Sequence, residues 1–129
     1  MSQIKIFGLR DHLGPITRRV SDVIHSCVVE ALRYPPGKRA HRFLLLDQSE
    51  FFYPEGRSEK YTIIEISMFE GRSVEAKKNL IRLLFQRFAE ELGIGSNDVE
   101  ITIFETPKAN WGFRGLPGDE HVLDYKVDV

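Results

Sequence analysis

The chain has 129 residues, of which 42% are hydrophobic and 29% charged, and its formal net charge at neutral pH is −1. This composition is typical of one globular domain with its own core and excludes an intrinsically disordered chain. Acidic and basic residues are mixed without a basic arm or stripe, which argues against a nucleic-acid partner. No run approaches the ~18 apolar residues of a membrane span, so we expect no membrane insertion.

A single cysteine, Cys27, excludes an intrachain disulfide and fits a reducing compartment. Residues 1–10 contain no positively charged stretch followed by an apolar run, so we expect no secretory signal and a cytoplasmic protein. Cys27 falls on an apolar helical face, where a small buried hydrophobic residue is expected rather than a nucleophile. The histidines show no metal-ligand spacing with cysteine or carboxylates, so we predict neither a metal site nor a cofactor.

The first elements in chain order are a strand, a helix and a second strand. Apolar and polar residues alternate over residues 4–7, which predicts a half-buried strand. Apolar residues then recur at helical spacing from Ile16 to Leu32. The Pro-Pro-Gly sequence at 35–37 ends that helix, because proline removes backbone donors and restricts the preceding residue. A buried strand is predicted over residues 41–46.

The same pattern returns about 60 residues later. Residues 64–68 alternate as a strand, and the turn that follows ends at Ser73, a plausible N-cap for a second helix. Apolar residues at helical spacing run over residues 80–92, and Gly93 stops the helix. The alternation at residues 101–103 predicts the closing strand.

We therefore predict an α+β fold made of a duplicated β-α-β unit. The expected segments are repeat one at about 3–47, a connecting arm at about 48–60, repeat two at about 61–105 and a C-terminal arm at about 106–129. Right-handed crossovers would place both helices on one face of a four-stranded sheet. The tail from Thr106 ends in a strand-like run at residues 122–129 and is too short to fold alone, so it should pack as a hairpin or arm.

One face of such a sheet is left without helices. The second helix is also apolar beyond a single stripe, because Ile81, Phe85 and Ala89 extend it. A monomer would expose a large apolar surface, so we expect oligomerisation. The alternative is that the C-terminal tail alone covers the sheet.

Three short segments carry a resemblance to a known family: the PPGKR turn at 35–39, the EGRS turn at 70–73 and the NWGF segment at 110–113. Together with the duplicated unit, and in this order, they resemble the tautomerase superfamily, nearest its malonate semialdehyde decarboxylase-like branch. The resemblance covers nearly the whole chain. It implies a homotrimer with three pockets near the subunit interfaces.

Members of this superfamily use an amino-terminal proline, exposed by removal of the initiator methionine, as a base or as a cation. Aligning the first strand through Ile4, Ile6 and Phe7 puts that position at Gln3. A glutamine side chain has no titratable amine and takes neither role. The alternative base is the true terminal amine, of Ser2 or Met1, with a reference pKa of roughly 7.7–8.0, or a water.

The resemblance assigns Arg72 to the arginine that binds the substrate carboxylate. A guanidinium forks onto a carboxylate whatever the family, and the following helix N-terminus adds amide donors. The alternative is a solvated turn arginine. The family's second arginine falls at Glu70, and its acid after the Pro-x-Gly turn falls at Lys38. Lys38 and Arg39 either add positive potential to the pocket or are simply solvated.

Trp111 and Phe113 match an apolar wall of the family's pocket, although a role in the core or at an interface fits them equally. Arg114, beside them, is a further substrate-binding candidate. These residues favour a pocket for a small 2-oxo or 3-oxo carboxylic acid, with keto–enol tautomerase or decarboxylase activity.

The alternative function is an inactive trimeric carboxylate-binding or scaffold protein, because Gln3, Lys38 and Glu70 depart from the family pattern. Single-stranded RNA binding is disfavoured, because the strands lack the aromatic and basic cluster that such binding needs.

Overall fold

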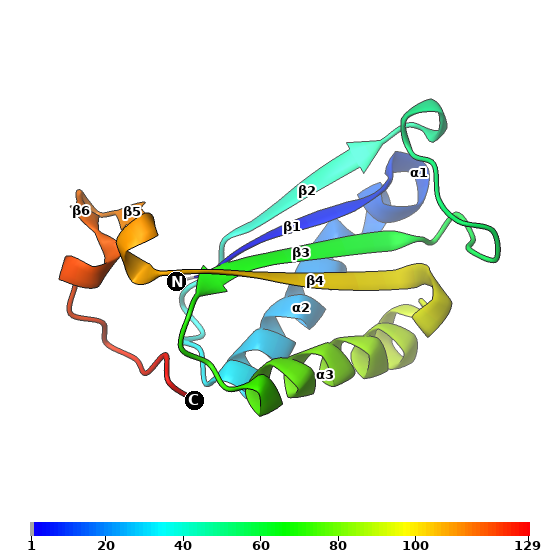
Figure 1. Ribbon diagram of the computed structural model, residues 1–129. Helices are drawn as coiled ribbons and strands as arrows, with labels where there is room; N and C mark the ends of the chain where they lie inside the picture. The colour runs from blue at the N-terminus through cyan, green and yellow to red at the C-terminus, as the bar shows by residue number, and fades with distance from the viewer. Residues whose placement is uncertain (1) are drawn as a thin grey trace.

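The computed structural model describes residues 2–129 (Figure 1). Its main sheet has the strand order β2-β1-β3-β4, in which β1 pairs parallel with β2, β3 pairs parallel with β4, and β1 and β3 are antiparallel. The strands are β1 (Ser2–Leu9), β2 (His41–Leu46), β3 (Thr62–Phe69) and β4 (Val99–Thr106). The predicted α+β fold with a duplicated β-α-β unit is confirmed.

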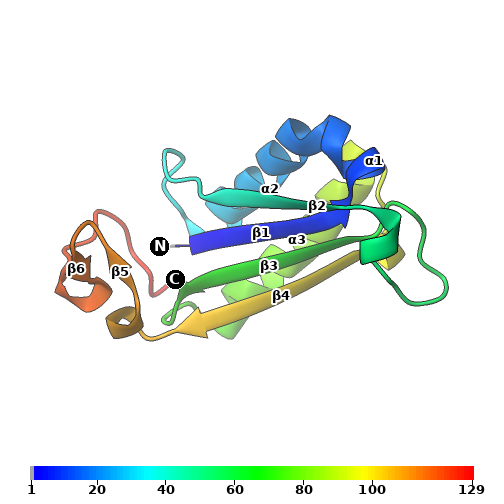
Figure 2. The same ribbon diagram turned by 90° about the horizontal axis from the view of Figure 1, so that it is seen from above.

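Both long helices, α2 (Thr17–Leu32) and α3 (Val74–Leu92), cover the same face of the sheet (Figures 1 and 2). As predicted, α3 begins after Ser73, whose Oγ accepts a hydrogen bond from the Ala76 N–H at 3.0 Å. It ends at Gly93, whose φ of 66° is the left-handed conformation that glycine adopts without strain. The apolar side chains of the covered face and of both helices form the core.

Shorter elements connect these parts. A four-residue helix, α1 (Arg10–Leu13), follows β1. The 3-10 turns lie at Gly14–Ile16, Gln48–Glu50, Ser96–Asp98, Lys108–Asn110 and Gly118–Glu120. Strands β5 (Gly112–Phe113) and β6 (Leu116–Pro117) form the predicted hairpin of the C-terminal arm.

The strand-like conformation predicted for residues 122–129 is wrong. The structure gives this segment, hereafter the strap, no strand. It runs past the end of the sheet rather than along an edge strand, so it has no ladder to join (Figures 1 and 2). Its backbone instead reaches the start of α3, where the Ser73 N–H donates to the Val129 carbonyl oxygen at 3.0 Å.

The opposite face of the sheet is largely uncovered among residues 2–129. Phe51 and Tyr61 of the connecting segment pack with Leu9 at one corner, and the strap lies beyond the end of the sheet (Figure 2). Elsewhere on this face Leu44 is 37% exposed and Phe104 48% exposed. Within the same residues, none of the helices is long and apolar enough to cross a bilayer.

We expect subunits to associate through this uncovered face, because contiguous exposed apolar surface is unfavourable in water. Light scattering after size exclusion should report a mass that is a multiple of the 14.9 kDa chain. Phe104→Glu should dissociate the particle by placing a charge in the contact. Val74→Glu, an equally polar change at an exposed position on α3, is the control. A single-subunit mass for the unmodified protein at micromolar concentration would contradict this expectation.

Candidate functional site

A cavity of about 360 Å³ opens at the end of the sheet where β1 and β2 begin. Its volume is within the range of small-molecule sites. Three basic side chains line it, and none of its lining residues carries a carboxylate. The lining residues are Ser2, Tyr34, Gly37, Lys38, Arg39, Ala40, Phe113 and Arg114.

Ser2, the first described residue of β1, is buried at this cavity. Side chains alternate along a strand, so Ser2 shares the helix-covered face with Ile4 and Ile6. Its backbone N–H donates to the Tyr34 Oη at 3.1 Å. Tyr34 is itself buried, so this hydrogen bond fixes the Ser2 nitrogen beside the cavity.

Gln3 lies elsewhere. It is exposed on the uncovered face of the sheet, opposite Ser67 of β3, and its Oε1 accepts a hydrogen bond from Arg42 Nη2 at 3.4 Å. The geometry therefore brings Ser2 rather than Gln3 to the cavity. The signal in the sequence was the alternation itself, because Ser2 has the same parity as the buried Ile4 and Ile6.

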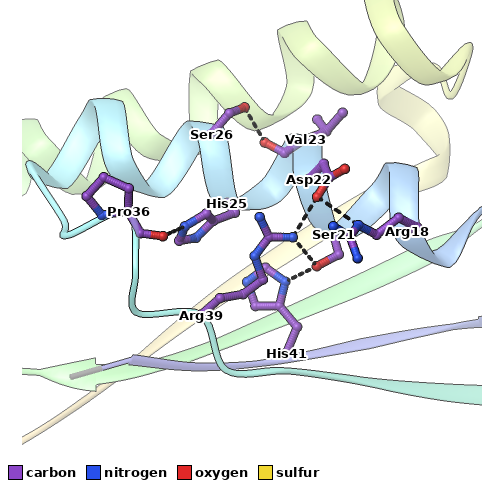
Figure 3. A network of polar contacts seen from close by, with 9 residues as sticks. All are labelled: Arg18, Ser21, Asp22, Val23, His25, Ser26, Pro36, Arg39 and His41. Carbon is purple, nitrogen blue, oxygen red and sulfur yellow. Dashed lines mark hydrogen bonds and ion pairs between the residues drawn. The ribbon is translucent and has the colours of Figure 1, made fainter.

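Two of the basic lining residues form ion pairs with acidic side chains. Lys38 Nζ lies 2.8 Å from Asp124 Oδ1 and 4.8 Å from the centre of the Tyr125 ring. The hydrogen bond from Lys38 lowers the pKa of Asp124 below its ordinary value. Arg39 turns away toward α2, where its Nη1 is 2.6 Å from Asp22 Oδ1 (Figure 3).

Arg114 sits at the tip of the β5–β6 hairpin and brings the third positive charge to the cavity. Arg114 and Gly115 are the two loop residues, with φ of 49° and 80°, as a type I′ turn requires. Left-handed backbone costs a residue with a Cβ roughly 1 kcal/mol. The guanidinium lies over the Phe113 ring at 5.1 Å, and the Phe113 ring also stacks with His121 at 4.2 Å and lies tilted against Phe69 at 6.0 Å.

Trp111 does not line the cavity. Its ring packs edge-on against Phe69 at 5.3 Å, and its Nε1–H donates to Thr106 Oγ1. The Gly118 N–H also donates to its carbonyl oxygen at 2.7 Å. Trp111 therefore anchors the C-terminal arm to the sheet, while Phe113 reaches the cavity.

Arg72 is buried just outside the cavity and is only 4% exposed. Its Nη1 reaches the Phe69 carbonyl oxygen at 3.5 Å, while Nε and Nη2 have no hydrogen-bond partner. Burial lowers the pKa of the guanidinium, and Tyr125 and Tyr34 counter this electrostatically. Tyr34 belongs to the cavity wall and contacts Tyr125 edge-on at 5.3 Å, and Arg72 itself does not line the cavity.

A second polar cluster lies between α2 and the start of β2 (Figure 3). Ser21 Oγ is 2.7 Å from His41 Nδ1, and Arg39 Nη1 reaches the same Oγ at 3.3 Å. Burial lowers the pKa of His41 to about 4, and the positive charge of Arg39 adds to the effect. Ser21 is buried away from the cavity lining, so this cluster secures the 37–40 segment rather than offering a nucleophile.

The structure thus brings together three of the predicted site residues, Lys38, Phe113 and Arg114, and adds Ser2 and Tyr34. Tyr34 gave no signal in the sequence beyond its place directly before the Pro-Pro-Gly turn. Among residues 2–129, no group of three or more His, Cys, Asp or Glu side chains is arranged to hold a metal ion.

Residues 38–114 match the model of a family described as tautomerase enzyme. Probable tautomerase RSp0893 of Ralstonia nicotianae is 40% identical over 55 residues, which are 43% of this chain and 79% of that protein. The FG41 malonate semialdehyde decarboxylase inhibited by 3-bromopropiolate is 26% identical, with a TM-score of 0.77 over 86% of this chain and 88% of that one. A fused 4-OT symmetric trimer is 19% identical, with a TM-score of 0.78 over 91% and 96% of the two chains, and shares the fold.

Acid should destabilise the fold through His41. Its pKa of about 4 in the folded protein lies below the ordinary histidine value of 6.5, so the unfolded chain binds the proton more readily. The contribution of His41 is fully present above pH ~6.5 and is lost as the pH falls toward ~4. Because the ring is only half-buried, we expect a loss on the order of 1–2 kcal/mol, less than the full shift implies. Urea unfolding from pH 7 to about 4.5 should show a shallower loss for His41→Gln than for His121→Gln; equal slopes would contradict this role.

Arg114→Asn should stabilise the chain by about 0.5–1 kcal/mol, because Asn-Gly suits a type I′ turn and asparagine tolerates the left-handed region. It should also weaken the binding of small carboxylates by removing a cavity cation. Arg33→Asn is the matched control, since Arg33 has a φ of 50° at the end of α2 but does not line the cavity. Urea unfolding should show a gain for both variants, and calorimetry a loss of affinity for Arg114→Asn alone.

Proposed function

The chain belongs to the tautomerase family, whose model matches residues 38–114, and we propose that its cavity binds a small 2-oxo or 3-oxo carboxylic acid and interconverts the keto and enol forms. The resemblance to this superfamily seen in the sequence is confirmed. One observation carries the proposal: Ser2, whose nitrogen is held by Tyr34, lines the same cavity as Lys38, Phe113 and Arg114.

Substrate binding follows from the charges and the apolar wall of the cavity. Arg114 offers a guanidinium that forks onto a carboxylate, and Lys38 adds a point charge. The Phe113 ring packs against the short carbon chain. The inhibitor named with the similar decarboxylase, 3-bromopropiolate, is itself a small carboxylate, which supports this class of ligand.

Proton transfer is assigned to the amine of Ser2, exposed once Met1 is removed. A free α-amine has a reference pKa of roughly 7.7–8.0, and neighbouring cations lower it, so a useful fraction is neutral in the cell. The neutral amine takes the enol hydroxyl proton, and the resulting ammonium returns a proton to the adjacent carbon. Tyr34 positions this nitrogen by accepting its N–H at 3.1 Å. Lys38 and Arg114 stabilise the enolate charge that develops between the two transfers.

We propose a homotrimer for the assembly. The uncovered face of the sheet calls for association, and the similarity in fold to a symmetric trimer supports three subunits. Arg72 keeps the carboxylate-binding role that the resemblance implies, although with the strap in place it is buried and does not line the cavity. A cytoplasmic location stays a prediction from the single cysteine.

A second candidate function is carboxylate binding without turnover. Neither position 2 nor position 3 is a proline: they are Ser2 and Gln3. The chain therefore lacks the proline amine that the resemblance implies as the base, which favours binding without turnover. Lys38 and Arg114 would still hold a carboxylate in such a protein.

We expect purified protein to accelerate ketonisation of phenylenolpyruvate, followed by ultraviolet absorbance, and intact mass to show loss of Met1. Arg114→Ala should raise KM on the order of tenfold, because a charge-assisted hydrogen bond contributes about 1.5–3 kcal/mol. One alanine inserted before Ser2 moves the amine by about 3.5 Å and should lower kcat at least ~100-fold. Arg82→Ala, an exposed arginine on α3, is the control.

Turnover and binding measurements together distinguish the tautomerase from the protein that binds carboxylates without turnover. Zero turnover across a panel of enols and oxo acids, together with calorimetric binding of the same acids, would favour the non-catalytic protein. Neither turnover nor binding would reject both.

A further inference from the structure

The strap lies directly over Arg72. Val127 is buried against the turn that holds the arginine, where a Cβ built on Gly71 would lie 3.1 Å from Val127 Cγ1. Tyr125 acts electrostatically on the guanidinium, and the Val129 carbonyl oxygen accepts the N–H of the neighbouring Ser73. The strap therefore encloses Arg72 between the end of β3 and the start of α3.

This enclosure buries a charge whose hydrogen-bond donors are only partly satisfied. Within residues 2–129 Arg72 forms no ion pair, and its Nε and Nη2 atoms lack hydrogen-bond partners. Glu105 is the carboxylate that raises the pKa of Arg72 through its charge, but Glu105 is already paired with Lys77 at 2.7 Å. A buried donor without a partner is unfavourable, and a buried cation more so. Closing the strap over Arg72 therefore has a free-energy cost, because it buries guanidinium donors that have no partner.

The unpartnered edge of Arg72 has a definite chemical match. Nε and Nη2 lie on one side of the guanidinium and together donate two parallel hydrogen bonds to the oxygens of a carboxylate. Such a ligand would satisfy both orphaned nitrogens and the charge at once.

Val127 and Val129 anchor the end of the strap, whereas its first half is held by a weaker latch. Within the described part of the chain, residues 2–129, its one ion pair is Asp124 with Lys38, and the Asp124 side chain is 73% exposed. Ion pairs at such exposure contribute about 0–1 kcal/mol. Val122, at the start of the strap, is 97% exposed and contributes no packing. Lys38 is also a wall residue of the cavity, so a ligand that enters there meets the latch.

We propose that the strap is a displaceable lid over the carboxylate-binding edge of Arg72, latched by the pair of Lys38 with Asp124. A carboxylate that enters the cavity replaces the Asp124 carboxylate on Lys38 and releases the strap. The Nε and Nη2 edge of Arg72 is then open to it. The identity of the ligand rests on the proposed function, whereas the lid itself does not.

Chemical labelling of Arg72 tests the lid without any ligand. Phenylglyoxal modifies accessible guanidinium groups, and peptide mass spectrometry reports the rate at each arginine of the full-length protein. Asp124→Asn should speed modification of Arg72 several-fold relative to the unmodified protein. Asp119→Asn makes the same charge change on an exposed turn outside the strap and should leave the rate unchanged. Equal Arg72 rates in all three proteins, or a rate in the unmodified protein equal to that of exposed Arg18, would overturn the lid.

A second measurement links the lid to binding. Because the apparent Kd scales inversely with the open fraction, Asp124→Asn should lower the Kd for pyruvate by the same factor by which it speeds labelling. Pyruvate should also increase hydrogen exchange at the Ser73 amide, which the strap protects. Pyruvate binding that Asp124→Asn does not tighten, with Ser73 exchange unchanged, overturns the lid and leaves the proposed function standing. Faster labelling with no binding of pyruvate or other small oxo acids supports the lid and rejects the proposed function.

Discussion

The antiparallel pairing of β1 with β3 brings the parts of the site to one end of the sheet. Ser2 lies opposite Met68, so the start of β1 and the turn that carries Arg72 are neighbours. Each outer strand is parallel to its inner partner, so the segment before His41 and the arm after Thr106 meet there too. A register slip of one residue would turn Ser2 to the uncovered face, and the cavity would lose its nitrogen.

Local sequence signals were sufficient wherever a regular element decided the structure. Alternation and helical spacing located the strands and both long helices, and Ser73 and Gly93 were recognised as the ends of α3 by the chemistry of caps. The strap had no such regularity. Its valines and tyrosine read as a strand, but its conformation is set by contacts with a distant turn and with Lys38. The burial of Arg72 depends on those contacts, so it was invisible in the sequence.

The electrostatics of the site depend on which cations are already paired. Three basic side chains line the cavity, yet Asp22 holds Arg39 and Asp124 holds Lys38. These two partners differ in kind. Arg39 is fixed by a cluster on α2 that also contains Ser21 and His41, and it acts as a brace for the 37–40 segment (Figure 3). Lys38 is paired with Asp124, an exposed carboxylate on an irregular segment. A ligand carboxylate has the same chemistry and can replace it.

The phenol pair joins the lid to the proposed base. In a proline the ring restrains the nitrogen, whereas here the hydrogen bond to Tyr34 holds the Ser2 nitrogen in place. Tyr34 is in turn packed against Tyr125, which belongs to the strap. An open strap exposes Arg72 but removes one support of Tyr34, and a closed strap restores that support. On the proposed mechanism, the carboxylate binds while the strap is open, at the cost of one support of Tyr34 and so of the Ser2 nitrogen. Exposure of Arg72 and support of the proposed base therefore oppose one another, which gives a physical reason for a latch that is weak and easily replaced.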